Sequence, residues 1–121
     1  MTNYQIDTLK DCHIKKDIMI TCHLKYVIDP YQLAVFEDYG KRWIKIVNRL
    51  GGHHHGYFMP SEGANNIAYA LFSFPSFADY ENYRKAMFSK DDKECVDAFK
   101  LAEDTRCIIS YERTFLSPLF E

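Results

Sequence analysis

Residues 19–30 read MITCHLKYVIDP, the clearest run of alternating polarity in the chain. Every second residue from Ile20 to Ile28 is apolar, which is the two-residue period of a strand with one buried face. Asp29 and Pro30 then predict the start of a helix, because aspartate caps free N–H groups and proline is tolerated in a first turn. A strand that leads directly into a helix is therefore the starting point for interpreting the other segments.

The later segments complete an alternation of strands and helices. Apolar residues recur at helical spacing from Leu33 to Leu50, and Gly51 and Gly52 end that helix. We expect the remaining elements to be strands at residues 53–59 and 67–74, a helix capped by Ser76 and Asp79, a helix over about 91–104, and a strand at 107–115. This order is βαββαβ, which predicts an α+β, ferredoxin-like fold with a four-stranded antiparallel sheet.

The predicted sheet is apolar on both faces. In this fold the helices cover only one face of the sheet. In the strand at 67–74, however, the residues that point to either face are apolar, and Ile67, Tyr69 and Leu71 form one of these two sets. A second copy of the chain would cover the other face, so we expect a homodimer. The length of 121 residues suits a single domain over 1–121, with a lead-in at 1–17 and a tail at 116–121.

The composition indicates which binding partners and which cellular compartment to expect. A net charge of −2 offers no broad positive field, so nucleic acid is not an expected partner. No apolar run is long enough to span a membrane. The cysteines lack Cys-x-x-Cys spacing and no signal peptide precedes them, which predicts reduced thiols and a cytoplasmic protein. They are Cys12, Cys22, Cys95 and Cys107.

Three runs of sequence resemble a known family. Residues 51–66 (GGHHHGYFMPSEGANN), 70–77 (ALFSFPSF) and 106–115 (RCIISYERTF) resemble the NIPSNAP family, in particular its compact bacterial members, and the similarity covers about residues 19–118. The resemblance implies the dimeric α/β barrel fold, whose superfamily also holds antibiotic-biosynthesis monooxygenases, muconolactone isomerase, chlorite dismutase and stress-response barrel proteins. NIPSNAP proteins have no established enzymatic activity, so the resemblance predicts the fold rather than a function.

The histidine run 53–55 is the main candidate for chemistry. Strict alternation places His53 and His55 on one face with Tyr57, and His54 on the other face. One of the imidazoles could act as a general base or as a hydrogen-bond donor. His53 and His55 could instead chelate a metal if a third ligand came from Glu62, His23 or Glu112, but no ligand set stands out, so we predict neither metal nor cofactor.

The other candidates surround the expected pocket. Glu62 lies in the polar loop after the histidine strand and could close over a cavity mouth, although a plain hairpin connection also explains it. We group His53, His55, Tyr57 and Glu62 as candidate catalytic residues. The candidate ligand-binding residues are His23, His54, Tyr69, Tyr111, Glu112 and Arg113. We expect Trp43 to be buried in the core, because it lies on the apolar face of the first predicted helix.

Two functional hypotheses remain open at this point. The first is a non-enzymatic homodimer that binds a small organic ligand or a partner protein. The second is a cofactor-independent or metal-assisted enzyme, monooxygenase-like or isomerase-like, that acts on a small organic molecule near the histidine run. Haem binding is a third possibility, although no proximal ligand is evident. An enclosed cavity that brings His, Tyr and Glu together would favour chemistry.

Overall fold

The computed structural model describes residues 19–120 of the chain. Its elements follow the predicted order, with one short 3-10 turn added before the first helix. They are β1 (Ile20–Ile28), η1 (Pro30–Gln32), α2 (Leu33–Arg49), β2 (His53–Phe58), β3 (Ile67–Phe74), α3 (Phe77–Met87), α4 (Lys93–Thr105) and β4 (Ile108–Leu116). The predicted lead-in at 1–17, with Cys12, lies outside the described residues.

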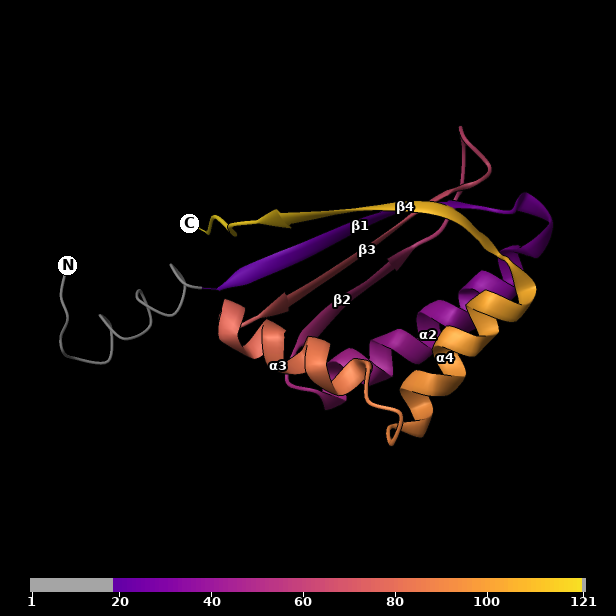
Figure 1. The fold of residues 1–121 in the computed structure, drawn as a ribbon. Helices are drawn as coiled ribbons and strands as arrows, with labels where there is room; N and C mark the ends of the chain where they lie inside the picture. The colour runs from indigo at the N-terminus through magenta and orange to yellow at the C-terminus, as the bar shows by residue number, and fades with distance from the viewer. Residues whose placement is uncertain (1–18, 121) are drawn as a thin grey trace, which may run out of the picture.

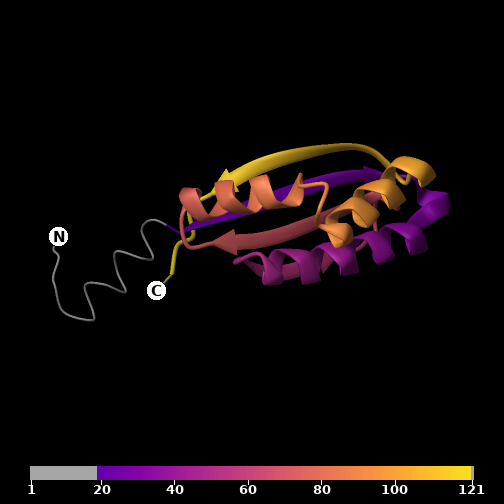
Figure 2. The ribbon, with the colours of Figure 1, turned by 60° about the horizontal axis from the view of Figure 1, so that its bottom comes forward.

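The four strands form one antiparallel sheet in the order β2-β3-β1-β4. The first and third strands are therefore central, as the split βαβ arrangement requires. Figure 1 shows α2, α3 and α4 together on one face of this sheet, and Figure 2 shows the same helices from their own side. The predicted α+β fold with a four-stranded antiparallel sheet is confirmed.

The central strands separate a helix-covered face from an open face. The even-numbered residues of β1 are buried, whereas His23, Lys25 and Val27 between them are partly exposed. Directly opposed residues of neighbouring strands share a face, so the register assigns the two sets of β3. Ala68, Ala70 and Phe72 lie beneath the helices, and Ile67, Tyr69 and Leu71 lie on the open face.

The long helix starts slightly later than predicted. Asp29 caps the 3-10 turn η1, since its Oδ1 accepts a hydrogen bond from the Tyr31 N–H at 2.9 Å, and α2 begins only after that turn. Gly51, with φ of 99°, ends the helix as expected for a glycine after a C-terminus. Trp43 is 5% exposed, which confirms its predicted place in the core.

The second helical segment is two helices, as predicted. The Ser76 hydroxyl accepts a hydrogen bond from the Asp79 N–H at 3.2 Å and caps α3. Asp92 caps α4 in the same way by accepting from the Cys95 N–H at 3.3 Å. Arg106 follows α4 in the left-handed conformation, with φ of 57°, and turns the chain toward β4.

Three smaller predictions can also be compared with the structure. β4 continues through Leu116, one residue beyond the predicted strand. The described cysteines, Cys22, Cys95 and Cys107, are free and buried. Among residues 19–120 no helix is long and apolar enough to cross a lipid bilayer.

Candidate functional site

A β-bulge in β2 decides where the histidines point. His54 pairs with Phe72, but the next residue of β3, Leu71, pairs with Gly56, so His55 is an extra residue in the strand. Gly56 has φ of 120°, a conformation that suits glycine at such a bulge. The bulge shifts the alternation by one position, and His54 and Tyr57 consequently lie on the same face beneath the helices.

The predicted grouping of Tyr57 with His53 and His55 is therefore wrong. It assumed a regular strand, and one inserted residue reverses every side chain that follows it. His53 and His55 are exposed on the open side, with ring centroids 4.8 Å apart. Phe58, which regular alternation would place on the same face as His54, is 53% exposed and pairs with Tyr69 of the open face.

His54 is a buried, neutral imidazole. It is 8% exposed and stacks on Tyr57, with ring centroids 5.1 Å apart and planes at 12°. Burial, together with the neighbouring charges of His55 and His53, lowers its pKa to about 4. Its Nδ1 accepts a hydrogen bond from the Gly56 N–H at 2.9 Å, so the proton resides on Nε2. His54 can therefore donate a hydrogen bond from Nε2 but is poorly suited to act as a base.

A cavity of about 560 Å³ lies between the covered face of the sheet and the helices. All four strands and α2, α3 and α4 contribute to its lining, which is mainly aromatic. The exposed lining residues Phe88, Glu103, Arg106 and Tyr111 lie at its open side. Clefts of this size, apolar with a few polar groups, are typical of small-molecule sites.

Three buried donors of lining residues make no hydrogen bond of ordinary length to a described residue, although the Tyr39 hydroxyl lies near Trp43 and the Cys22 thiol near Arg113. The three donors are Trp43 Nε1 from α2, His54 Nε2 from β2 and Arg113 Nε from β4. A buried polar group without a partner costs free energy, so natural proteins keep few of them. The three donors come from separate elements, and each belongs to a residue that lines the cavity.

Buried tyrosines supply the remaining polar atoms of the cavity. Burial raises the pKa of Tyr26, Tyr39, Tyr57 and Tyr83, so all four remain protonated phenols near neutral pH. The rings of Tyr26 and Tyr57 stack, with their centroids 6.0 Å apart. The cavity therefore combines neutral donors with aromatic walls.

Sequence reasoning singled out neither Tyr39 nor Tyr83. A signal was present, because Tyr39 lies three residues after Phe36 and four before Trp43, on the buried stripe of α2. Tyr83 has the same spacing within α3. Such a stripe predicts burial, but whether buried tyrosines pack solidly or line a cavity depends on the neighbouring elements.

The structure separates the predicted catalytic and ligand-binding residues into two groups. Tyr111 and Arg113 line the cavity together with His54 and Tyr57. The other candidates do not line the cavity. Glu62 is exposed in the loop between β2 and β3. His23 and Tyr69 lie on the open face with ring centroids 5.4 Å apart, and Glu112 is exposed on that face opposite Lys25.

The exposed histidine pair does not form a metal site with other described residues. His55 Nε2 lies 2.8 Å from the Ser73 hydroxyl and is engaged there. No group of three or more His, Cys, Asp or Glu side chains within residues 19–120 has a metal-binding arrangement. The suggested third ligands Glu62, His23 and Glu112 therefore do not complete a site with His53 and His55.

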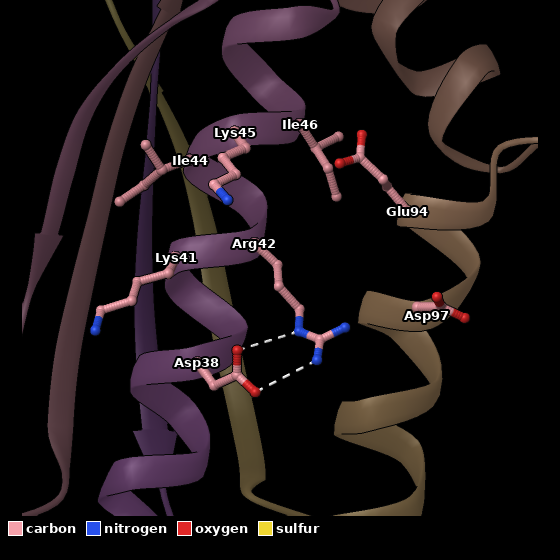
Figure 3. Close-up of a pocket in the computed structure, with 8 residues that line it drawn as sticks. All are labelled: Asp38, Lys41, Arg42, Ile44, Lys45, Ile46, Glu94 and Asp97. Atoms are coloured by element: carbon pink, nitrogen blue, oxygen red, sulfur yellow. Dashed lines mark hydrogen bonds and ion pairs between the residues drawn. The ribbon is translucent and has the colours of Figure 1, made fainter.

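A second hollow lies between α2 and α4 (Figure 3). Its lining is mostly charged and solvent-exposed, and Asp38 pairs there with Arg42 at 3.2 Å. In the same view the Lys41 side chain points away from α4. Exposed ion pairs of this kind contribute little to stability or recognition, so we do not consider this hollow a candidate site.

The fold and the cavity together define a class of protein. The chain has a ferredoxin-like α+β fold, with an aromatic cavity between its sheet and its helices. The NIPSNAP family model matches residues 24–120, and the chain belongs to this family.

Solved structures with the same fold agree with this assignment. A NIPSNAP-like domain protein from Burkholderia xenovorans aligns with a TM-score of 0.70 and 19% identity over 85% of this chain and 87% of that one. A NIPSNAP family protein of unknown function from Agrobacterium tumefaciens aligns with a TM-score of 0.70 and 18% identity, over 84% of this chain and 89% of that one. A Bacteriodes thetaiotaomicron protein assigned to the antibiotic biosynthesis monooxygenases aligns with a TM-score of 0.61 and 18% identity, over 87% of this chain and 93% of that one. A search of curated proteins gives no significant match.

Proposed function

We propose that this NIPSNAP protein binds a small, largely apolar organic molecule that carries a hydrogen-bond acceptor, in the cavity between sheet and helices. The observation that carries the proposal is the set of buried donors on Trp43, His54 and Arg113, which make no hydrogen bond of ordinary length within the described chain. A carbonyl or carboxylate oxygen in the cavity would satisfy one or more of them. Binding would then recover free energy that the unliganded fold forgoes.

The walls of the cavity support an apolar, planar ligand. Tyr57 presents a ring already stacked on His54, and Phe88 stacks on Phe99 with ring centroids 5.6 Å apart and planes at 8°. Aromatic faces favour flat, unsaturated molecules through offset stacking. The volume of about 560 Å³ lies within the roughly 300–1,000 Å³ typical of ligand pockets.

Binding of 2-acetonaphthone, a neutral ketone with a flat aromatic body, tests this proposal by calorimetry. Ala102 of α4 lines the cavity, so Ala102→Phe should fill part of it and weaken binding at least about tenfold. Ala34→Phe is the matched control, because Ala34 is an exposed residue of α2 outside the cavity. The ketone should bind the parent and the control with similar affinity. Absence of binding to the parent, or equal binding to both variants, would contradict the proposal.

An isomerase-like enzyme is the second candidate function. It is favoured by Glu103, the carboxylate at the cavity's open side, which could accept a substrate proton while His54 Nε2 donates to the developing enolate oxygen. The assignment of one structural neighbour to the monooxygenases also directs attention to oxygen-bearing substrates. Exchange of the methyl protons of 2-acetonaphthone in D₂O would detect such enolisation. If the protein is such an enzyme, the parent should exchange these protons faster than buffer alone does, and Glu103→Gln should lose that acceleration.

We also propose that two copies of the chain associate through the open face of the sheet. That face carries partly exposed apolar residues, among them Phe58 at 53%, Tyr69 at 38% and Leu116 at 44%. Apolar sheet faces seldom remain uncovered in water, and structural neighbours of the dimeric barrel type support pairing of like subunits. The free cysteines suit a reducing compartment, and we propose the cytoplasm.

A further inference from the structure

The charges that line the cavity are unequal in sign. The lining holds three arginines, Arg84, Arg106 and Arg113, against the single carboxylate of Glu103. Glu103 and Arg106 are both exposed at the open side, where water and salt screen their charges. The excess positive charge therefore belongs to the two half-buried arginines, Arg84 and Arg113.

Arg113 reaches the cavity from the sheet. It lies opposite Leu24 in the register of β1 and β4, so its side chain is on the helix-covered face. Its guanidinium carbon lies 5.6 Å from the centre of the Tyr111 ring, and its buried Nε makes no hydrogen bond of ordinary length to a described residue. Within the described residues no carboxylate forms an ion pair with it. A half-buried cation without an anion is costly, which favours an anion supplied from outside the chain.

Arg84 approaches from α3 on the other side of the cavity. Its Nη1 donates to the Tyr80 hydroxyl at 3.2 Å, and its guanidinium carbon lies 5.2 Å from the centre of the Phe88 ring. Like Arg113, it forms no ion pair with a described carboxylate. The stacked and hydrogen-bonded guanidinium is held in place yet keeps other N–H groups for a ligand.

Both guanidinium groups act on the same buried thiol. Burial raises the pKa of Cys22 to about 11, and the charges of Arg113 and Arg84 both oppose that rise. The two cations are thus within electrostatic reach of one point on β1. His54 is neutral and the nearby tyrosines remain protonated, so no described group lining this part of the cavity supplies a compensating negative charge.

We infer that the ligand of this cavity is an aromatic or conjugated carboxylate, whose anion lies between Arg113 and Arg84 and whose flat body lies against the aromatic walls. This inference rests on the proposed ligand-binding function and adds the ligand's charge. Arginine suits this task because its planar N–H pairs match the two oxygens of a carboxylate. The buried Nε of Arg113 is one such unused N–H.

A matched pair of probes separates charge from shape. 2-Naphthoate and 2-acetonaphthone share the same ring system and differ mainly in a carboxylate against a methyl ketone. Calorimetry on the parent protein near neutral pH should show 2-naphthoate binding at least about tenfold more tightly than the ketone. Arg113→Gln keeps a side-chain N–H donor but removes the charge, so it should abolish most of this preference.

Two further variants complete the experiment. Arg84→Gln should also reduce the preference for the anion, and it serves as the second test if Arg113→Gln proves unfolded by circular dichroism. Arg42→Gln removes an exposed charge beside Asp38, outside the cavity, and should leave the preference unchanged. Equal affinity for both probes would overturn the inference while the proposed function stands. Binding of neither probe would overturn the proposed function itself, and a preference that survives both cavity variants would show that these arginines do not hold the anion.

Discussion

His54 shows how one residue acquires its role from its surroundings. As a free side chain it would titrate near 6.5, within the range where histidine acts as a pH switch. In the fold it lies against Tyr57 and Phe72, with ring centroids at 5.1 and 5.4 Å, and its Nδ1 is occupied by the Gly56 N–H. Its chemistry is thereby restricted to donation from Nε2.

This environment predicts a definite pH dependence of stability. Because the pKa of His54 is about 4 in the folded protein against 6.5 unfolded, the unfolded chain binds its proton more readily. The stability that neutral His54 contributes is complete above pH 6.5 and is lost as the pH falls toward 4. Urea unfolding across this range should show that loss, and the imidazole should titrate near pH 4 by NMR.

Two variants identify the residue responsible for this loss. His54→Asn keeps an acceptor for the Gly56 N–H but cannot titrate, so its stability should fall less between pH 6.5 and 4. His55→Asn, at an exposed neighbouring position, should retain most of the parent's pH dependence. A His54 resonance that titrates near 6.5 would contradict the buried, neutral assignment.

At the scale of elements, the start of α4 joins two helices. Asp92 caps α4 through the Cys95 N–H, and its carboxylate also accepts from Arg49 Nη2 of α2 at 2.8 and 2.9 Å. The hydrogen bond from Arg49 holds the pKa of Asp92 below its usual value. Arg49 Nε pairs with Glu94 at 2.8 Å, so one arginine connects α2 to the first turn of α4.

Removing this cap should destabilise the fold measurably. Asp92→Ala should lower the free energy of unfolding by about 1 to 2 kcal/mol, since a lost N-cap typically costs about 1 and a partly exposed ion pair less. Asp92→Asn retains a capping oxygen and should cost less than the alanine variant. Asp38→Ala is the control, because its exposed pair with Arg42 lies within one helix and should change stability by no more than about 0.5 kcal/mol. Urea titration measures all three, and an Asp92→Ala midpoint equal to that of the parent would refute the capping role.

At the scale of the whole molecule, the open sheet face predicts the oligomeric state. Light scattering at micromolar concentration should give about twice 14.3 kDa. Leu71→Asp places a charge at the centre of that face, on β3 opposite His23, and should shift the protein toward monomer. Tyr31→Asp is the control, because Tyr31 is 95% exposed on η1, away from the sheet. A parent protein that is monomeric at this concentration would contradict the proposed association through the open face of the sheet.

The local patterns of the sequence determined most of the fold. The alternation in residues 20–28, the capping pair Ser76 and Asp79, and the glycine at Gly51 each act within a few residues, so each was visible before any tertiary contact was known. The order of these elements then restricts the topology to few choices, and the family resemblance agrees with the structure.

The site depended on contacts between distant segments, which local patterns do not contain. The bulge at His55 reversed the predicted faces of the histidine strand, because its position is set by pairing with β3 rather than by the residues of β2 alone. The aromatic residues of α2 and α3 were predictable as buried, yet only the packing of three helices over the sheet leaves a cavity among them. Periodicity determines which side chains face inward, whereas the space left between them depends on how all the elements meet.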